Sequence, residues 1–437
     1  MIEIAVTKRW KRQRFSSLFT ENKNKNQNCT VTHALQFFFG TIIPKKEYEL
    51  TEALRKIYTK YTIVSPGNII LNGLNLNYDF VSQRIGLVKE RGIITSAYIV
   101  LQPREGVNYE YYCYLFKAMD AHKFFHGMGS GIRLTLSYDD LKNVLLPVPP
   151  REEQDQIVRF LDWKVSGINR LINIKRKEIK DLESMKQVTV SSAVTRGLNP
   201  NAPMKFSGVK WLGNIPAHWE TVELRQLLHQ VSVKNHPELP LLSVVREQGV
   251  IVRDVANKDA NHNYIPDDLS GYKVVKKGQF AMNKMKAWQG SYGISPYTGI
   301  VSPAYFIFDV SFDNLEYFHY AIRSKVYVNF FAQASGGIRV GQWDLQMDKM
   351  KEIPFIVPSA DEQIAIITYI KKTLPKYSKV IEKLKAEINA LEEYKAKLIS
   401  DVVTGKIDVR DVKIPSFDMV EEDFEDNDEI DASGEVE

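Results

Sequence analysis

The sequence of 437 residues is poor in cysteine and contains no long apolar run. Its two cysteines, Cys29 and Cys113, stand outside any CxxC or Cys/His spacing, which excludes a disulfide framework and a cysteine-ligated zinc site. The longest apolar runs, such as residues 304–308, are far shorter than the roughly 20 residues of a membrane-spanning helix. The N-terminal residues also lack the apolar core of a signal peptide. We therefore expect a cytoplasmic protein without metal or disulfide bonds.

Motifs of three kinds of DNA-processing enzyme are also missing. An adenine methyltransferase needs an Asn/Asp-Pro-Pro-aromatic motif, but the only Pro-Pro pair, Pro149-Pro150, follows valine. A translocase needs a Gly-Lys-Ser/Thr phosphate loop, whereas Gly405-Lys406 is followed by Ile407. A metal-dependent nuclease needs clustered carboxylates, and the pair Asp267-Asp268 has no suitably spaced lysine after it. We therefore predict that this chain is not an enzyme.

The net charge of +5 conceals a strong asymmetry along the chain. The last 17 residues, 421–437, contain ten Asp or Glu and no Lys or Arg, so the rest of the chain carries +15. A body this basic favours a polyanionic partner, and nucleic acid is the first candidate. The alternative is a basic protein without such a partner. We expect the acidic tail to be disordered and solubilising, or else to compete with DNA for the basic face.

The chain contains an internal repeat of about 200 residues. Four anchors recur 209 residues further on, namely Trp10 as Trp219, Pro149 as Pro358, Glu153-Gln154 as Glu362-Gln363, and Thr195 as Thr404. Between these anchors the offset drifts by two or three residues, as where Gly131-Ile132-Arg133 matches Gly337-Ile338-Arg339. Loop insertions between fixed elements would produce such a drift. A period this long predicts a duplicated domain, and hence a pseudo-twofold repeat.

Each half has the same predicted order of elements. Short apolar runs broken by Gly, Pro and Asn predict strands and turns, and a proline-marked stop follows them. A long helical stretch comes next, with acidic residues in its first turn. In the second half, apolar residues alternate in steps of three and four, as in a coiled-coil seam: Ile367, Ile370, Leu374, Tyr377, Ile381, Leu384, Ile388 and Leu391. The first half has a weaker seam, interrupted by a lysine: Leu161, Val165, Ile168, Ile172, Lys175, Ile179 and Leu182.

We predict two α/β modules separated by two long antiparallel coiled-coil helices, because a seven-residue seam needs a helical partner. The alternative is that each helix packs on its own module. Ser166-Gly167 and Leu374-Pro375 predict a break or kink in each helical stretch, with the longer helix starting afterwards. In the first half this longer helix, from Ile168 to Ala193, would extend roughly 39 Å, about one turn of B-DNA. The predicted boundaries are 1–149 for the first module, 150–198 for the first helical region, 199–358 for the linker and second module, 359–412 for the second helical region and 413–437 for the tail.

Several of these segments resemble the specificity subunit of type I restriction–modification systems. Both helical repeats open with Pro-x-x-x-Glu-Gln, at 149–154 and 358–363. The segment SGVKWLGNIPAHWE at 207–220 resembles the lead-in to a target-recognition domain of that family, and AVTRGLNP at 193–200 and VVTGKIDV at 402–409 resemble its helix ends. The resemblance covers about residues 8–412. The first module departs from it, since KRWKRQR at 8–14 replaces the Trp-Leu-Gly-x-Ile-Pro lead-in.

This resemblance implies a DNA-binding, non-catalytic specificity subunit. Each target-recognition domain would read one half of a bipartite double-stranded DNA target, and the central helices would set the spacer between the halves. The helices would also dock two methyltransferase subunits, which bind S-adenosylmethionine and methylate adenine. Restriction subunits using ATP and Mg²⁺ would join complexes that cut foreign DNA. The alternatives are a subunit of a methylation-only complex and a coiled-coil adaptor that binds only protein.

Residues that could contact DNA occur in three places and near the N-terminus. Phosphate contacts need Lys and Arg, whereas base contacts need Arg, Lys, Asn and Gln. The alternatives are a turn whose Asn residues only tolerate positive φ, structural salt bridges for the repeated Gly-Ile-Arg, and simple solvation at the N-terminus. The candidates are Asn72, Asn75, Asn77 and Arg84 in the first module, Lys284, Lys286 and Gln289 in the second, Arg133 and Arg339 in Gly-Ile-Arg, and Lys11 and Arg12 near the N-terminus.

Overall fold

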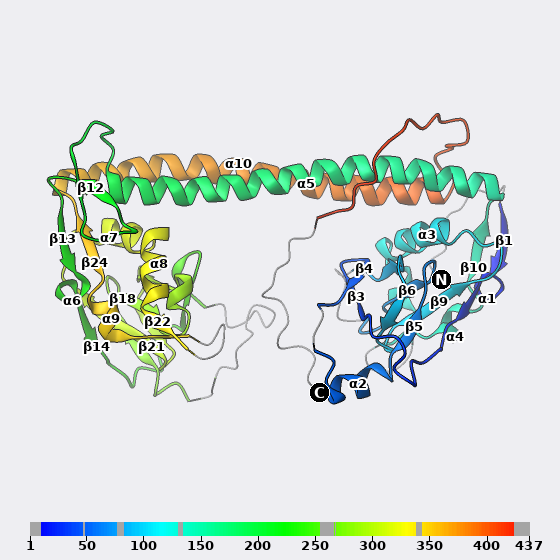
Figure 1. Ribbon diagram of the computed structural model, residues 1–437, viewed down its shortest axis with the longest axis horizontal. Helices are drawn as coiled ribbons and strands as arrows, with labels where there is room; N and C mark the ends of the chain where they lie inside the picture. The colour runs from blue at the N-terminus through cyan, green and yellow to red at the C-terminus, as the bar shows by residue number, and fades with distance from the viewer. Residues whose placement is uncertain are drawn as a thin grey trace. The chain divides into compact units, whose positions relative to one another are not determined.

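The computed structural model describes residues 10–46, 49–76, 83–129, 134–253, 266, 268–337 and 343–423. The chain divides into two compact units. Unit 1 comprises Met1–Arg176 and Lys385–Glu437, and unit 2 comprises Lys177–Leu384. Helix α5 (Arg151–Arg196) begins in unit 1 and ends in unit 2, whereas helix α10 (Ala360–Val403) begins in unit 2 and ends in unit 1. Each unit therefore contains one end of each long helix (Figure 1).

Unit 1 is built on a four-stranded antiparallel sheet. Its strand order is β2 (Phe19–Glu21), β9 (Ile99–Pro103), β6 (Ile69–Leu71) and β7 (Ile85–Leu87). Helix α3 (Tyr109–Ala121) packs on this sheet beside β7. The smaller elements are α1 (Phe15–Leu18), β3 (Leu35–Phe38), β4 (Thr41–Pro44), α2 (Glu52–Tyr58), β5 (Thr62–Val64), β8 (Gly92–Ile94), η1 (Phe124–Gly127) and α4 (Tyr138–Leu141). Strands β3 and β4 pair with each other, as do β5 and β8.

Unit 2 has a four-stranded antiparallel sheet with a corresponding order. The strands are β14 (Leu228–Val231), β21 (Tyr305–Val310), β18 (Phe280–Asn283) and β19 (Tyr292–Ile294). Helices α7 (Leu315–Ile322) and α8 (Lys325–Gln333) follow β21. The smaller elements are β11 (Met204–Phe206), β12 (Asn214–Pro216), α6 (Leu224–Leu227), β15 (Leu242–Val245), β16 (Gly249–Val252), β17 (Lys273–Val275), η2 (Ala287–Gln289), β20 (Gly299–Val301), β22 (Ser335–Gly336), β23 (Asp344–Leu345) and α9 (Met347–Lys351).

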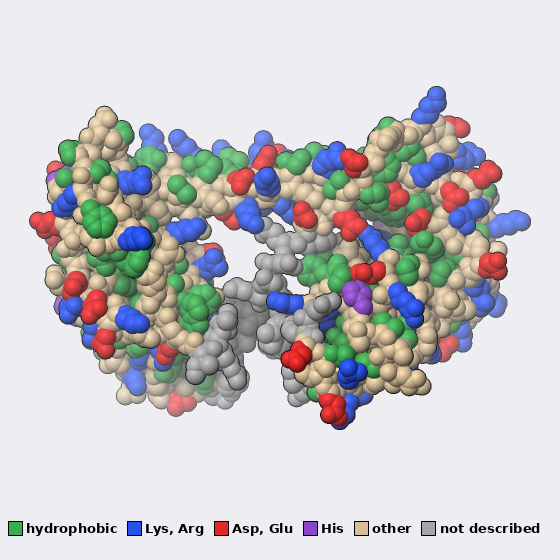
Figure 2. Space-filling model, in the orientation of Figure 1, with side chains coloured by type: hydrophobic (Ala, Val, Ile, Leu, Met, Phe, Trp, Pro, Cys, Tyr) green, Lys and Arg blue, Asp and Glu red, His purple; other side chains and the backbone are tan. Residues whose placement is uncertain are grey.

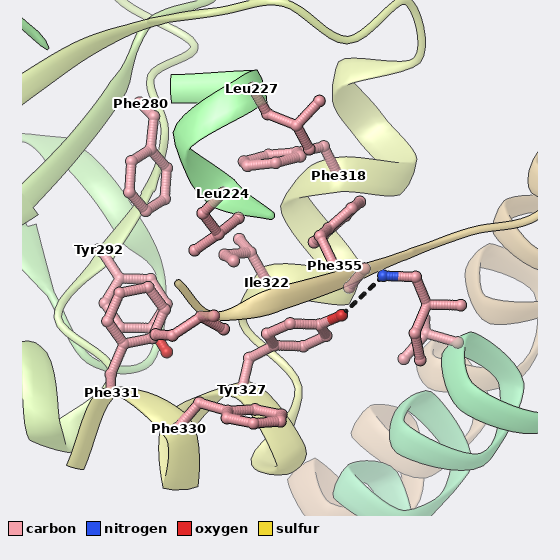
Figure 3. Close-up of a cluster of buried hydrophobic side chains, with 14 of the residues drawn as sticks. Leu224, Leu227, Phe280, Tyr292, Phe318, Ile322, Tyr327, Phe330, Phe331 and Phe355 are labelled. Atoms are coloured by element: carbon pink, nitrogen blue, oxygen red, sulfur yellow. Dashed lines mark hydrogen bonds between the residues drawn. The ribbon is translucent and has the colours of Figure 1, made fainter. Parts of the chain in front are cut away.

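An aromatic core joins these elements of unit 2 (Figure 3). The ring of Phe318 lies 4.8 Å from that of Phe355 and 5.9 Å from that of Phe280, centroid to centroid. Tyr327 is buried among them, and its hydroxyl oxygen accepts a hydrogen bond of 3.0 Å from the backbone N–H of Ile356. The core therefore links helices α7 and α8 to β24 (Pro354–Val357), the strand that leads into helix α10.

The start of each long helix is held by the same set of contacts. In unit 1, β1 (Lys11–Arg14) pairs with β10 (Leu145–Val148), and the indole Nε1 of Trp10 donates to Glu153 Oε2 at 3.0 Å. In unit 2, β13 (Glu220–Glu223) pairs with β24, and Trp219 Nε1 donates to Glu362 Oε2 at 3.0 Å. Both tryptophans are buried. The glutamine after each glutamate donates to the carbonyl of the preceding proline, Gln154 to Pro149 at 2.8 Å and Gln363 to Pro358 at 2.9 Å.

The end of each long helix is also fixed to a module. The end of α10 is bonded to the module of unit 1, where α5 starts, and the end of α5 is bonded to the module of unit 2, where α10 starts. In unit 1 the hydroxyl of Tyr111 donates to the carbonyl of Val403, in the last turn of α10, at 3.0 Å. In unit 2 the hydroxyl of Tyr317 donates to the carbonyl of Val194, near the end of α5, at 3.4 Å. Burial raises the pKa of both phenols far above the usual value, so they remain donors. Each module thus holds the first turn of one long helix and the last turn of the other.

Within each unit the two long helices lie side by side and antiparallel (Figure 1). In unit 1 the Lys175 ammonium forms an ion pair with Glu387, so the lysine that interrupts the predicted seam has a partner on the facing helix. In unit 2 the Lys186 Nζ donates to Ser378 Oγ at 3.3 Å. The predicted seam residues of α10 are all buried or half-buried, whereas α5 is more exposed in its middle.

The prediction that the long helices break at Ser166-Gly167 and at Leu374-Pro375 and start again afterwards is wrong, whereas the alternative of a kink stays a prediction. Helix α5 runs for 46 residues through Ser166-Gly167, and α10 runs for 44 residues through Pro375. A glycine inside a helix costs about 1 kcal/mol and a proline about 3 kcal/mol. Burial of apolar side chains on both sides of the proline, such as Ile370 and Ile381, offsets that cost, and the Ser166 side chain is itself buried. Tertiary packing therefore overrides the local helix-breaking signal.

Residues 418–423, which the sequence analysis expected to belong to a disordered tail, are hydrogen-bonded to helix α5 within unit 1. The Glu422 side chain is only 11% exposed because it contacts Arg176 and Lys395. Residues 424–437 lie outside the described residues. In the part of the chain that is described, no helix combines the length and the apolar character needed to cross a membrane.

Replacing Trp219 by Phe should destabilise unit 2, because Glu362 loses its indole donor and the smaller ring leaves part of a buried site empty. We expect the free energy of unfolding, measured by urea denaturation, to fall by about 1–3 kcal/mol. Trp211→Phe is the matched control, since Trp211 is 55% exposed and its loss should change stability by less than about 0.5 kcal/mol. Equal losses in the two variants would contradict a role for the indole–carboxylate bond.

The difference in the free energy of unfolding between wild type and Trp219→Phe should depend on pH. Burial raises the pKa of Glu362, but hydrogen bonds from Trp219, His218 and Ser359 outweigh burial and lower it below its usual value. A group whose pKa is lower in the folded state stabilises the fold above its unfolded pKa, about 4.3, and loses this contribution as pH falls through the folded pKa. The stability gap between wild type and Trp219→Phe should therefore be full at neutral pH and narrow below about pH 4.

Candidate nucleic-acid interface

In unit 2 the end of β18 leads into a compact turn, residues 283–291, which includes η2. Gly290 has a φ of +94°, a conformation that favours glycine and lets the turn close. The Gln289 N–H donates to the carbonyl of Lys286 at 3.1 Å, and the Lys286 side chain is exposed. The Gln289 side chain is half-buried. Of the three candidates in this turn, Lys286 is therefore the most accessible cation.

This turn is joined to β23, the strand that follows residues 338–342. The Leu345 N–H donates to the carbonyl of Lys284 at 3.2 Å, and the Lys284 Nζ lies 2.9 Å from Asp344 Oδ2. The rings of Trp288 and Trp343 lie 5.2 Å apart. The ion pair offsets part of the charge of Lys284. The fold thus brings the lysine-rich turn beside the segment that follows the second Gly-Ile-Arg.

Unit 1 makes a similar junction between two loops. The loop at 72–76 follows β6, and the carbonyl of Gly73 accepts a hydrogen bond of 2.9 Å from the N–H of Leu136. A Cβ at Gly73 would lie 2.8 Å from the Leu136 carbonyl oxygen, so this close approach requires glycine. The segment that contains Leu136 follows residues 130–133. In both units, therefore, the polar loop after the third strand of the sheet contacts the segment after Gly-Ile-Arg.

Arg84 is the one candidate among the described residues whose side chain lies in the interior. It is 1% exposed, and its Nη1 donates to the carbonyls of Asn72 at 3.1 Å and Leu74 at 2.8 Å. Its backbone N–H donates to Asp120 Oδ2 at 2.8 Å. Burial raises the pKa of the Asp120 carboxyl above its usual value. Arg84 therefore supports the loop from inside, which corrects the prediction that its side chain contacts DNA directly. The reason is that loop carbonyls without strand partners need a buried donor.

The other candidates of the first module occupy different environments. Asn72 is half-buried, and its Oδ1 accepts from the N–H of Leu74 at 3.2 Å, as in a polar turn. Asn75 is exposed and has a φ of +52°, so its backbone conformation agrees with the alternative of a turn asparagine while its amide faces solvent. Lys11 and Arg12 are exposed on β1, the strand beside the start of α5. Asn77, Arg133 and Arg339 lie outside the described residues.

A half-buried arginine in unit 2 was not found from the sequence. Arg323 donates to the carbonyl of Tyr292 at 2.6 Å, and to those of Arg246 at 2.8 Å and Glu247 at 2.9 Å. Beside it, burial together with the charge of Arg323 lowers the pKa of His319 to about 4, so the neutral imidazole accepts from the Ile294 N–H. Arg323 fastens the turn between β15 and β16 to β19. Its position just after helix α7 carries no sequence signal for this role.

The charges of the described surface are mixed. On the face drawn in Figure 2, Lys and Arg side chains are interspersed with Asp and Glu over both units instead of forming one continuous stripe. Among the residues that the structure describes, no group of three or more His, Cys, Asp or Glu is placed to hold a metal ion. The arrangement is therefore one of polar loops on a rigid sheet, which suits recognition of a polar ligand.

Replacing Lys286 by Ala should weaken the binding of the chain to duplex DNA. If this exposed ammonium contacts a phosphate, the slope of log affinity against log salt should decrease by about 0.9. Lys277→Ala is the matched control, because Lys277 is exposed in the same module but precedes β18, at the opposite end of the strand from the turn. The measurement is fluorescence anisotropy at several salt concentrations. Identical slopes for the two variants would argue against a contact at this turn.

Comparisons with known proteins agree with a recognition role. Residues 56–181 match the family model described as type I restriction modification DNA specificity domain. The chain is 24% identical over 440 residues to the type I restriction enzyme MjaVIII specificity subunit of Methanocaldococcus jannaschii, covering 94% of this chain and 95% of that protein. It is 26% identical over 288 residues to the putative MjaX specificity subunit of the same organism, covering 63% and 62%.

A solved structure shows the same fold at low sequence identity. A chain in a structure of a type I R-M system superimposes with a TM-score of 0.61 at 13% identity, over 92% of this chain and 99% of that one. At this identity the likeness concerns the fold alone, namely a mixture of helices and strands with long helices. Together, the match of residues 56–181 and the curated relatives of similar length show that this chain resembles the specificity subunits of type I restriction–modification systems over nearly its whole length.

Proposed function

We propose that this chain is the subunit of a type I restriction–modification complex that reads a bipartite DNA target, one half with each module. The observation that carries this proposal is the recurrence of one arrangement in both units. The strand order β2-β9-β6-β7 corresponds to β14-β21-β18-β19, and in each unit a polar loop after the third strand contacts the segment after Gly-Ile-Arg. The units are then copies of a pseudo-twofold repeat. Their different loops would read different half-targets.

The two long helices are proposed to form an antiparallel coiled coil that sets the spacer. The buried seam of α10 and the contacts from Lys175 and Lys186 to the facing helix support this proposal. Helix α5 connects the two modules along the chain, and each helix end is hydrogen-bonded to a module. The number of helical residues would therefore determine the distance between the half-targets, at about 1.5 Å per residue.

The helices are also proposed to dock the methyltransferase subunits. Exposed apolar side chains on a charged helix indicate a surface for a protein partner. Those on α5 are Leu171 and Ile174 in unit 1 and Met185 and Val188 in unit 2, the last at 65% exposed. In unit 2 a shallow groove is lined by Asp181, Ser184, Met185, Val188 and Thr189.

The chemistry of the complex is proposed to lie in the partner subunits, in the cytoplasm. S-adenosylmethionine would be bound by the methyltransferase subunits, and ATP and Mg²⁺ by restriction subunits where they are present. This chain would then supply specificity without catalysis. The absence from its sequence of a methyltransferase Asn/Asp-Pro-Pro-aromatic motif and of a phosphate loop supports that division.

Exchanging residues 10–149 for the corresponding module of another such subunit should change only one half of the methylated sequence. The physical reason is that contacts between the module and the helices, such as the Trp10–Glu153 bond and the bond from Tyr111 to the Val403 carbonyl, come from residues outside the polar loops, so a different set of loops would leave them in place. The measurement is a genome-wide map of methylated adenine in cells that express either chain. A change in both halves would refute the model of two independent readers.

Replacing Val188 by Glu should weaken assembly with the methyltransferase subunits at least about tenfold, because it places a charge on an exposed apolar position. Gln187→Glu is the matched control: it adds the same charge at the neighbouring exposed residue without removing an apolar side chain. Binding is measured by titration with the methyltransferase subunit. Full assembly of the Val188→Glu variant would place the docking surface elsewhere.

A further inference from the structure

After helix α10, residues 418–423 form an extended segment that crosses α5 within unit 1 (Figure 1). We call this segment the strap. Side chains of α5 bond to its backbone. The Ser166 Oγ accepts from the Val420 N–H at 3.2 Å, and the Asn169 Nδ2 donates to the Val420 carbonyl at 2.9 Å. The contacts thus begin at the first residues of the strap.

The next two helix residues continue this ladder. The Asn173 amide makes two bonds, donating to the Glu421 carbonyl at 2.9 Å and accepting from the Asp423 N–H at 3.0 Å. Arg176 Nη1 donates to the Asp423 carbonyl at 2.7 Å. The steps from Ser166 through Asn169 and Asn173 to Arg176 are three, four and three residues, so all four side chains lie on one face of the helix. This face binds the backbone of an extended peptide.

The ladder also contains a site for one acidic side chain. Asn173 brackets Glu422, whose carboxylate contacts Arg176 Nη2 at 2.6 Å and the Lys395 ammonium on α10. Glu422 is 11% exposed and Lys395 14%. Burial raises the pKa of Glu422, but Lys395 and Arg176 outweigh burial and lower it, so the carboxylate is ionised at neutral pH. A buried carboxylate between two hydrogen-bonded cations is stable only when all three groups are present.

The strap also reaches the first module. The Glu421 carboxylate forms an ion pair with the ammonium of Lys89, between β7 and β8. Upstream of the strap, Gln156 Nε2 donates to the carbonyls of Val409 at 3.0 Å and Val412 at 2.8 Å. The C-terminal segment therefore touches the module and both helices of unit 1.

We infer that this face of α5 is a binding site for an extended acidic peptide, occupied by the chain's own strap, which fastens the first module to the helix pair. The ladder is not repeated on α10. At the positions 209 residues further on stand Pro375, Ser378, Glu382 and Lys385, which lack the two amides that hold the backbone. The ladder that holds the peptide backbone thus occurs on α5 and not on α10, and the inference does not depend on the proposed role in DNA recognition.

Hydrogen exchange on the full-length chain tests this inference. The N–H groups of Val420 and Asp423 should be protected, because both are bonded to α5 side chains. Glu422→Gln should raise their exchange rates at least about tenfold, since hydrogen bonds to charged groups are the strong ones. Glu421→Gln is the matched control, because Glu421 is 63% exposed and forms only a surface ion pair. It should raise the two exchange rates less than about threefold.

A second variant tests the hydrogen bonds to the strap backbone separately from the charge of Glu422. Asn173→Ala should also release the Asp423 N–H by about tenfold, whereas Asn201→Ala, at an exposed loop asparagine, should leave it unchanged. Exchange of Val420 and Asp423 at the rate of an unstructured peptide in the unaltered chain would overturn the inference. So would equal effects of Glu422→Gln and Glu421→Gln. A dimer in light scattering that Glu422→Gln converts to monomer would show that the strap binds a second copy, which also overturns it.

Discussion

The hydrogen bond from a buried tryptophan to the glutamate in the first turn of each long helix is the constraint on which the rest of the structure depends. A helix start offers unpaired N–H groups and a positive dipole end, which favour a carboxylate there. That carboxylate then accepts a hydrogen bond from the indole N–H of Trp10 or Trp219. Each tryptophan directly precedes a strand, β1 or β13, which pairs with the strand that leads into the long helix, β10 or β24. One side chain therefore stabilises the helix start and fixes its direction from the module.

Two arginines, the buried Arg84 and the half-buried Arg323, play the corresponding part inside the modules. The guanidinium of each donates to backbone carbonyls of a loop or turn, Asn72 and Leu74 for Arg84 and Arg246 and Glu247 for Arg323. A planar group with five donors can satisfy several such carbonyls at once. The polar side chains at the loop tips can then differ between the modules while the loop bases stay in place. This separation of a fixed base from a variable tip is what a recognition surface requires.

The two ends of the helix pair are completed in different ways. After α5 the chain forms the β11–β12 hairpin and enters the second module, whereas after α10 it becomes the strap that bonds to Asn169, Asn173 and Arg176. The first module lacks the lead-in segment that precedes the second. In unit 1, the segment after α10 supplies contacts to the module and to both helices.

The sequence by itself determined the features that recur or that have a period. Among the anchors at an offset of 209, the tryptophans and glutamates are the residues that join helix to module. The steps of three and four identified the buried side of α10. It also located the polar loops, but not the burial of Arg84, the contact of Gly73 with Leu136, or the continuity of α10 through Pro375. Only the tertiary structure decided these, and with them the docking of the acidic strap. The physical reason is that periodicity and turn chemistry are local, whereas the environment of a charged side chain is set by groups distant in the sequence, as Glu422 and Arg176 are.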